Sequence, residues 1–306
     1  MKIAIDIGYG DVKVSAENGK TFKFTNAISY AGATSVDYGS NALEIFNFEG
    51  IEYLVGEQAL LNDPFITREY ANLFQYAPLL VYKALKMLGI KPGEEIQLAT
   101  GLSLKDYDKA AEFGKNLTKI FVNEELYEIK PKNIKIKPQG RGIYVDFKNN
   151  LPKIELDFFA IVDIGYNTFD FLVYMNDKPV PNKNYANTLG VNIVVQQVQI
   201  VLNKQFKSNF SEQEVNQFIL TKTVRIGSTT HDISHTIRTE VSKYVMKLKN
   251  EINAKNSDII SKVFNVVISG GGAYLLEEHK IKMFDHEAYS KTPHEFANVR
   301  GYLAEI

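Results

Sequence analysis

The 306 residues carry 35 basic and 36 acidic side chains, a formal net charge of -1 and no cysteine. This length exceeds what one compact core usually holds, so we expect two domains. The balanced charge provides no basic field for gripping a nucleic-acid backbone, and the lack of cysteine excludes disulfides and thiolate chemistry. No apolar run approaches the ~20 residues that span a bilayer. Asp6 and Asp11 lie in the segment that would have to form the apolar core of a secretory signal peptide, so we expect no such signal. We therefore expect a cytoplasmic chain without a membrane span.

The chain opens with an apolar strand at residues 3–5, an acidic glycine turn, and a second strand at residues 12–14. This pattern predicts a β-hairpin. Glycine lets the backbone turn tightly and approach a ligand, so amides in the turn can point at phosphate oxygens. The aspartates supply charge partners for a cation. The residues of this motif are Asp6, Ile7, Gly8, Tyr9, Gly10, Asp11, Val12 and Lys13.

The next segment predicts a strand at residues 20–28 and an insertion at 29–41. A small hairpin at 46–56, a short helix at 56–61, and a helix at 76–88 that Gly89 and Pro92 close should follow. Beyond it we expect a strand at 96–100, a helix at 104–121, and strands at 126–129 and 134–136.

Gln139 stands in the segment Lys137-Pro138-Gln139-Gly140-Arg141-Gly142, directly after a predicted strand. By itself the segment is typical of a Pro-Gln turn. An uncharged amide can also hold a water molecule by accepting and donating hydrogen bonds without strongly deprotonating it. Both interpretations stay open at this point.

A second hairpin with the same design follows in the middle of the chain. The apolar run at residues 158–162 leads into an acidic glycine turn, and residues 171–173 form the return strand. Two such hairpins imply two similar half-molecules that face one another with a nucleotide between the turns. The residues of this second motif are Asp163, Ile164, Gly165, Tyr166, Asn167, Thr168, Phe169 and Asp170.

The last third of the chain predicts three helices and a glycine-rich turn. One helix opens at residues 187–192 and runs through 202, a second begins at Ser211 with Glu214 completing a capping box, and a third spans 237–252. A strand at residues 266–268 then leads into a glycine turn and a helix, which would allow a nucleoside to approach closely. The turn consists of Ser269, Gly270, Gly271, Gly272 and Ala273.

The three motifs, in this order, resemble those of the actin-like ATPases, in which the hairpins are the first and second phosphate motifs and the glycine turn is the adenosine motif. The closing segment at residues 293–302 resembles that of the ParM/StbA branch, the plasmid-partitioning actins, where it forms a helix packed on the first domain. The resemblance implies an α/β fold of duplicated, ribonuclease H-like domains. Domain I would comprise residues 1–150 and 290–306, with an outer subdomain at about 29–75. Domain II would comprise 151–289, with an outer subdomain at about 192–254.

The resemblance also implies roles for individual residues. Asp6 and Asp163 would hold Mg²⁺ through its bound waters, Gln139 would orient the attacking water, and Asp170 would assist it or cap the turn. ATP, or GTP in its place, would contact the two turns, Lys13, the glycine motif and the helix at 237–252. The expected nucleotide-binding residues are Gly8, Tyr9, Gly10, Asp11, Lys13, Gly165, Tyr166, Asn167, Thr168, Gly270, Gly271, Gly272, Ala273 and Lys243.

From this resemblance we expect an ATPase that polymerises into dynamic filaments with copies of itself, for plasmid DNA segregation, together with a DNA-bound adaptor protein. The alternatives are a non-filamentous ATPase or nucleotide-binding regulator and a small-molecule kinase of the same superfamily. One departure from the family pattern concerns Tyr9 and Tyr166, which stand where many relatives carry small or hydroxyl residues. Phosphate contacts at these two positions should therefore come from the backbone.

Overall fold

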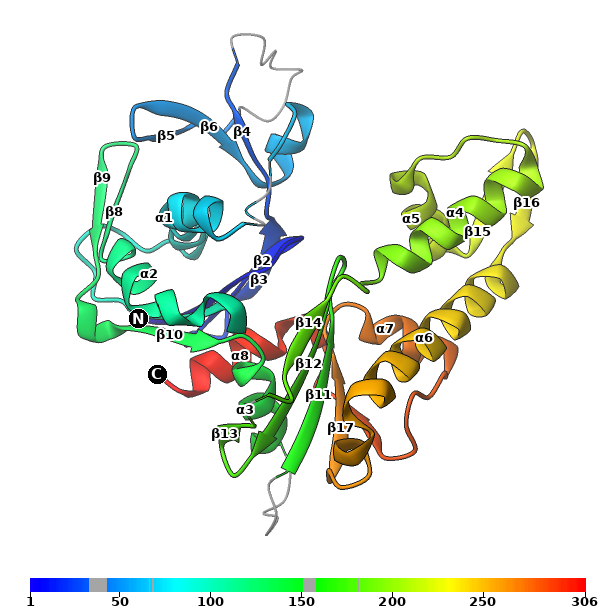
Figure 1. Ribbon diagram of the computed structural model, residues 1–306. Coiled ribbons are helices and arrows are strands. Elements are labelled where there is room, and N and C mark those ends of the chain that lie inside the picture. The colour runs from blue at the N-terminus through cyan, green and yellow to red at the C-terminus, as the bar shows by residue number, and fades with distance from the viewer. Residues whose placement is uncertain (33–42, 66, 68, 151–157, 181) are drawn as a thin grey trace. The chain divides into compact units, whose positions relative to one another are not determined.

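The computed structural model describes residues 1–32, 43–65, 67, 69–150, 158–180 and 182–306. The chain divides into two compact units: unit 1 comprises residues 1–149 and 295–306, and unit 2 comprises residues 150–294. Each unit is an α/β structure with its own central sheet and its own hydrophobic core (Figure 1). The insertion expected at residues 29–41 lies largely outside the described residues.

The central sheet of unit 1 has five strands in the order β10-β7-β1-β2-β3. Strands β1, β7 and β10 run parallel, whereas β2 and β3 are added to β1 as an antiparallel meander. The hairpin predicted at the start of the chain is thus confirmed as β1 and β2. The five strands are β1 (Lys2–Ile7), β2 (Asp11–Ala16), β3 (Thr21–Thr25), β7 (Gln97–Leu102) and β10 (Ile134–Pro138).

Helices cover both faces of this sheet. Successive strand residues point to opposite faces. Ile3 and Ile5 of β1 join the core beneath α1 (Tyr70–Leu88) and α2 (Ala110–Asn116), whereas Ala4 packs with α8 (Ala297–Ala304). On this second face the strand residues have to be small, because α8 lies very close to the sheet. A Cβ on Gly101 would lie 2.4 Å from the hydroxyl of Tyr302. Helix α8 in turn packs against α3 (Arg141–Asn149).

The outer part of unit 1 is built from short strands. A three-stranded antiparallel sheet has the order β4-β6-β5, and a separate hairpin joins β8 and β9. These strands are β4 (Ile28–Tyr30), β5 (Phe46–Phe48), β6 (Ile51–Val55), β8 (Lys119–Val122) and β9 (Glu125–Glu128). Short 3₁₀ helices occur at Gly56–Leu61, Leu104–Lys109, Pro131–Asn133 and His294–Phe296.

The sheet of unit 2 repeats the plan of the first. Its order is β13-β12-β11-β17-β18, with β14 also paired to β12. The antiparallel hairpin β11–β12 lies beside the parallel strand β17, just as the hairpin β1–β2 lies beside β7. This duplication was predicted from the two glycine turns. The strands are β11 (Phe158–Ile164), β12 (Phe169–Met175), β13 (Lys178–Pro179), β14 (Tyr185–Asn187), β17 (Asn265–Ser269) and β18 (Glu287–Tyr289).

The helices of unit 2 pack their apolar sides on one face of this sheet, where Ala160, Val162 and Ile164 point. The capping box predicted at Ser211 is confirmed: its hydroxyl accepts a hydrogen bond from the Glu214 amide, and the Glu214 side chain accepts one from the Ser211 amide. The elements are α4 (Asn192–Phe206), α5 (Glu212–Thr221), a hairpin of β15 (Thr223–Ile226) and β16 (Thr229–Asp232), α6 (Ser234–Ile260) and α7 (Ala273–His279).

Several local predictions need correction. The helix expected at residues 104–121 ends at Asn116, and the chain continues as β8, where Ile120 and Val122 alternate into the core with a period of two. The strand expected at 20–28 is interrupted at residues 26–27, where Asn26 holds the first glycine turn. Helix α3 was not predicted: Gly140 directly precedes it and Gly142 lies in its first turn, and glycine is a weak helix former. The hairpin of β15 and β16 was also missed.

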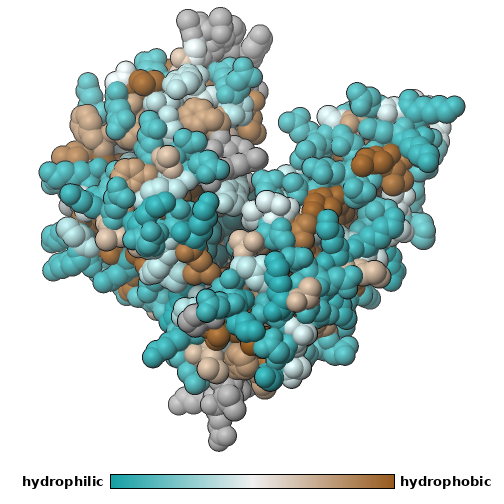
Figure 2. Space-filling view, in the orientation of Figure 1, coloured by the Kyte–Doolittle hydropathy of each residue, from teal (hydrophilic) through white to brown (hydrophobic). Residues whose placement is uncertain are grey.

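Within the described residues, no helix combines the length and the apolar character needed to cross a membrane. The face drawn in Figure 2 is predominantly hydrophilic, with separate apolar side chains among the polar ones.

Candidate nucleotide-binding turns

The first glycine turn joins β1 to β2 and is closed by its own backbone. The Gly8 amide donates a hydrogen bond to the Asp11 carbonyl over 3.0 Å. A Cβ on Gly10 would meet nothing within 4 Å, so a ligand has room beside this residue. The Gly8 amide is therefore engaged inside the hairpin.

Asn26 fixes the carbonyl groups of the same turn. Its backbone amide donates to Gly10 O over 2.9 Å, and its side-chain amide donates to Gly8 O over 2.7 Å. The side chain is 1% exposed and also donates to the hydroxyl of Thr67. Sequence reasoning missed Asn26. Its signal was a polar residue inside an otherwise strand-like run.

Asp6 and Lys13 face each other across the first hairpin. Asp6 is 5% exposed, and burial raises its pKa, while the charge of Lys13 and a hydrogen bond from the Asn298 side chain lower it. Its Oδ1 atom has no hydrogen-bond partner. The ammonium of Lys13 lies at the turn, since a Cβ on Gly8 would be 3.1 Å from its Nζ. A buried carboxylate therefore lies beside a cation at the predicted phosphate turn.

Asp11 has a structural partner. Its carboxylate forms an ion pair with Lys23 of β3 over 3.2 Å, and Lys23 also lies 3.6 Å from Glu295. Asp11 thus contributes its carbonyl to the closure of the turn and its side chain to the sheet. The expected role of Asp11 in nucleotide binding stays a prediction.

The second glycine turn repeats the first in its hydrogen bonding. The Gly165 amide donates to Thr168 O over 2.9 Å, which is the same step of three residues that joins Gly8 to Asp11. Asp163 stands two residues before its glycine, as Asp6 does, but its partner across the hairpin is Asp170. The first hairpin therefore pairs a carboxylate with an ammonium, and the second places two carboxylates opposite each other.

Helix α4 begins against the backbone of the second turn. The amides of Val191 and Asn192 donate to the carbonyls of Gly165 and Tyr166 over 3.1 and 2.8 Å. The Asn192 side chain donates to that of Asn167 over 3.3 Å. A Cβ on Gly190 would lie 2.3 Å from Tyr166 O, so only glycine fits there. The carbonyls of this turn are thus occupied by protein donors.

The two tyrosines of the turns are both partly exposed, Tyr9 by 38% and Tyr166 by 37%. The Tyr166 hydroxyl donates to the Glu212 carboxylate and accepts a hydrogen bond from Asn216 over 3.0 Å. Both partners belong to α5. The Tyr166 side chain thus joins the second turn to a helix.

The glycine motif after β17 packs directly on the second hairpin. A Cβ on Gly270 would lie 2.4 Å from Asp163 Oδ1, and one on Gly272 would lie 2.2 Å from the Ile164 side chain. A Cβ on Gly271, in contrast, would meet nothing within 4 Å. The Ala273 methyl is buried in the core. Protein packing accounts for Gly270, Gly272 and Ala273, and Gly271 alone of these has open space, while the approach of a nucleoside to this motif stays a prediction.

Gln139 lies in the connection between β10 and α3. Its amide donates to Leu102 O over 2.7 Å, and the next residue, Gly140, has a φ of 81° that favours glycine. The Gly140 amide donates to Asn298 Oδ1 over 3.2 Å. The backbone around Gln139 is therefore fixed on both sides.

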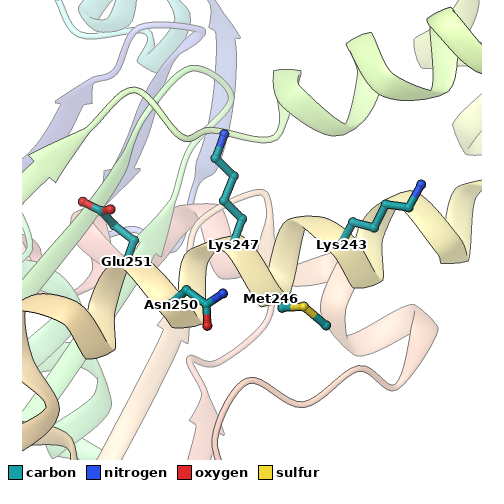
Figure 3. A pocket seen from close by; sticks show the side chains of 5 residues that line it. All are labelled: Lys243, Met246, Lys247, Asn250 and Glu251. Atoms are coloured by element: carbon teal, nitrogen blue, oxygen red, sulfur yellow. The ribbon is translucent and has the colours of Figure 1, made fainter.

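Helix α6 carries a surface pocket of about 460 Å³ lined by Lys243, Met246, Lys247, Asn250 and Glu251 (Figure 3). Lys243, Lys247 and Glu251 project from one side of the helix, and Lys243 donates to Glu240 over 2.7 Å. Tyr244 lies in the core instead. The expected nucleotide-binding residue Lys243 therefore lines an accessible pocket on unit 2.

Magnesium fits the residues of the first hairpin as a water-bridged ion. Among the described residues, no group of three or more histidine, cysteine, aspartate or glutamate side chains is placed to hold a metal directly. Mg²⁺ usually keeps several of its waters and takes few protein ligands, so it needs no such group. The buried Oδ1 of Asp6 lacks a partner and can accept a hydrogen bond from a metal-bound water.

Two family descriptions match the chain, one in each half. Residues 4–142 match the N-terminal domain of actin-like proteins, and residues 161–281 match the C-terminal domain of archaeal MreB-like actin homologues. Together these segments include both glycine turns and the glycine motif. No curated protein is similar enough in sequence to match the chain.

Solved structures share the fold along the whole chain. The archaeal actin homologue Ta0583 has a TM-score of 0.82 at 17% identity, and the alignment covers 99% of this chain and 98% of that one. Ta0583 in complex with ADP gives a TM-score of 0.81, also at 17% identity, with the same coverage. A ParM from a 15-stranded filament of Clostridium botulinum gives 0.76 at 21% identity, again covering 99% and 98% of the two chains.

Proposed function

Because the chain belongs to the actin-like proteins, we propose that it binds and hydrolyses ATP with Mg²⁺ and polymerises into filaments. One observation carries the proposal: Asp6 and Asp163 occupy equivalent places before two glycine turns that are closed by equivalent hydrogen bonds. Two turns of one design, in two units of one fold, suit the recognition of one polyphosphate.

Each residue of the two turns has a role in this proposal. The open space at Gly10 admits a phosphate beside the backbone, and the Lys13 ammonium at the same turn offsets its charge. Thr168 adds a hydroxyl from the second turn. Asp6 and Asp163 hold the waters around Mg²⁺, which neutralises charge that develops on the phosphates.

Gln139 orients the attacking water in this proposal. Its backbone is held by Leu102, and its neighbour Gly140 is held by Asn298, so its side chain starts from a fixed position. An amide positions water without removing its proton, which gives slow hydrolysis and a long-lived triphosphate state. The Asp170 side chain helps Gln139 to hold the same water or caps the second turn.

Filament formation and its biological use are supported by the relatives. The Clostridium botulinum ParM is known as a filament, and Ta0583 is known with ADP. We propose that the chain assembles with its own copies in the cytoplasm and moves plasmid DNA through a DNA-bound adaptor protein. A nucleotide biases assembly only through contacts that differ between the triphosphate and diphosphate states.

The test mixes purified protein with Mg²⁺ and ATP, GTP, ADP or no nucleotide, and records light scattering, phosphate release and electron micrographs together. We expect filaments with a triphosphate, followed by phosphate release and by decay of the scattering signal. Q139A should still form filaments, but should release phosphate about 10²-fold more slowly, the scale of a positioned catalytic group.

Three results would contradict the proposal. Phosphate release without filaments at high protein concentration would exclude the filament. Unchanged release from Q139A would exclude Gln139 as the group that orients the water. A failure of ATP to bind would exclude the nucleotide site itself.

A further inference from the structure

Asn26 binds the first glycine turn with both its side chain and its backbone. The side chain is 1% exposed, and its Nδ2 atom donates to Gly8 O and to the Thr67 hydroxyl, each over 2.7 Å. The backbone amide of Asn26 donates to Gly10 O over 2.9 Å. A carbonyl oxygen can only accept a hydrogen bond, so the side-chain atom beside Gly8 O has to be the nitrogen. The turn itself therefore fixes the orientation of the Asn26 side-chain amide.

The bond to Gly8 O determines where the next amide of the turn points. In a trans peptide, such as Gly8–Tyr9, the carbonyl of one residue and the N–H of the next point in opposite directions. Asn26 reaches the Gly8 carbonyl from the buried side, whereas Tyr9 and Gly10 are exposed. The Tyr9 N–H is thus directed away from Asn26. Successive backbone amides held in this way in a turn form a concavity that binds anions.

The second glycine turn holds the equivalent carbonyl with a different donor. Gly8 and Gly165 have the same place in their turns, because each donates its amide to the carbonyl three residues later. Gly165 O accepts a hydrogen bond from the Val191 backbone amide at the start of α4 over 3.1 Å. In the first turn a side chain does what a helix backbone does in the second. The orientation of the first turn therefore depends on the identity of residue 26.

We propose that Asn26 is a positioning residue for phosphate, which holds the Gly8–Tyr9 peptide so that its N–H faces the phosphates of the nucleotide. The inference rests on the proposed function for the ligand, whereas the hydrogen bonds of Asn26 do not depend on it. Because the first turn is assigned to the phosphates and not to the nucleoside, loss of Asn26 should weaken the binding of ATP and spare that of adenosine. A general loss of structure would weaken both.

Three variants test this assignment. N26A removes both side-chain hydrogen bonds, and N26D keeps the shape but places a carboxylate oxygen beside the Gly8 carbonyl oxygen. N133A is the matched control, since the Asn133 side-chain amide donates to the Ile96 carbonyl over 3.2 Å in the same unit. This contact lies where β7 and β10 begin, whereas the first turn follows the end of the parallel strand β1. Thermal unfolding shows whether each variant is folded.

The first measurement is hydrogen exchange of the Gly8 amide without nucleotide, because this amide donates to Asp11 O and closes the turn. We expect exchange about 5- to 10-fold faster in N26A, the effect of losing one neutral hydrogen bond. N26D should show at least as large an increase. N133A should stay within about twofold of the unaltered protein, since local openings at separate places in a fold occur independently.

The second measurement is displacement of a fluorescent ATP analogue by ATP and by adenosine. N26A should bind ATP about tenfold more weakly, the scale of one hydrogen bond to a charged group, and change its adenosine affinity less than about threefold. N26D should lose at least as much ATP affinity, because it adds a negative charge beside the turn. N133A should change neither affinity.

A third measurement uses the unaltered protein and applies even if N26A and N26D do not fold. ATP at about ten times its dissociation constant should slow exchange of the Asn26 backbone amide about tenfold, because a ligand that binds only the closed turn suppresses its opening. The Asn133 backbone amide, which donates to Lys130 O over 2.8 Å, should keep its exchange rate.

Four results would overturn the proposal: an unchanged exchange rate of the Gly8 amide in N26A, an equal loss of ATP and adenosine affinity in N26A, the same effects in N133A, or ATP that binds without slowing exchange at Asn26. Failure of the proposed function has a different appearance. In that case ATP does not bind the unaltered protein, and the Gly8 exchange rate in N26A still decides whether Asn26 holds the turn.

Discussion

Tyr166 of the second glycine turn accepts a hydrogen bond from Asn216 of helix α5 over 3.0 Å. The same hydroxyl donates to Glu212, one turn earlier on that helix. The turn that we propose to bind phosphate is thus bonded through one side chain to helix α5 of unit 2. Any ligand that reshapes this turn also acts on α5.

Removal of this hydroxyl should loosen the contact without removing a charge. Burial raises the pKa of Tyr166 to about 12, so the group is neutral near pH 7. We expect Y166F to lower the free energy of unfolding by about 1–2 kcal/mol, because two hydrogen bonds are lost. ATP affinity should fall severalfold. Calorimetry and binding of a fluorescent ATP analogue measure the two effects.

Y30F serves as the matched control for this prediction. Tyr30 is 59% exposed and packs its ring near Tyr53. If Y30F and Y166F have equal effects on ATP affinity, the link through α5 does not contribute to binding.

The buried carboxyl of Asp6 should reduce the stability of the protein without nucleotide. Its pKa is raised in the folded state, so the folded state holds the proton more strongly than the unfolded state does. Stability therefore falls as the pH rises from the unfolded pKa through the raised folded pKa. We expect D6N to raise the melting temperature at pH 7 by about 2–4 °C, the shift per 1 kcal/mol for a domain of ~150–250 residues.

The same D6N variant should lose most of its phosphate release, because the neutral amide has no negative charge with which to hold the waters bound to Mg²⁺. D63N, at an exposed position, is the control and should change neither property. A D6N protein that melts at a lower temperature than the original at pH 7 would show that the Asp6 charge stabilises the fold.

Gly271 and Gly272 should respond in opposite ways to alanine. A Cβ on Gly272 collides with the Ile164 and Val191 side chains, whereas the space at Gly271 is open. We expect G272A to cost about 1–3 kcal/mol or more from overpacking, whereas G271A should melt like the original protein. G271A should nevertheless weaken binding of the ATP analogue.

This pair of glycine variants needs only melting curves and a binding titration. If G271A binds the analogue as tightly as the original protein does, the open space beside Gly271 is not used by a nucleotide.

Glu305 should stabilise unit 1 at higher pH, which is opposite to the pH dependence of stability expected from Asp6. Burial raises its pKa, but the hydrogen bonds and charges of Arg141 and Lys137 outweigh burial, and the pKa is lowered from its ordinary value. The Glu305 carboxylate lies 2.7 Å from Arg141 and 2.9 Å from Lys137. Its contribution is therefore present above the unfolded pKa and is lost as the pH falls through the folded pKa.

We expect E305Q to lower the melting temperature at pH 7 and to match the original protein in acid, below the folded pKa of Glu305. E128Q, at an exposed position in a surface ion pair, is the control and should have little effect at either pH. If E305Q lowers the melting temperature equally at both pH values, the shape of the Glu305 side chain and not its charge determines its contribution to stability.

Local motifs predicted much of this structure because they depend on neighbouring residues. The two hairpins follow from apolar runs around Gly8 and Gly165, and the capping box follows from Ser211 and Glu214. The helix expected through residue 121 failed because a helix and a strand of apolar residues cannot be told apart over so short a run. Long-range packing decided in favour of β8.

The supporting residues of the site could not be predicted in the same way. Asn26 holds the first turn from 16 residues beyond Gly10, and Asn298 accepts a hydrogen bond from the Gly140 amide across 158 residues, and no spacing rule joins such positions. The glycine motif was recognised, but its sequence does not tell that Gly270 and Gly272 pack against protein and that Gly271 does not. Three-dimensional contacts supply that distinction.

Asn26 also has a mechanical consequence. It lies between β3 of the central sheet and β4 of the outer sheet, and its hydrogen bonds reach Gly8 and Gly10. The chain crosses from one sheet to the other within two residues. A force that pulls on β4, such as the pull of a neighbouring molecule, would reach the first turn through the backbone amide and the side-chain amide of Asn26.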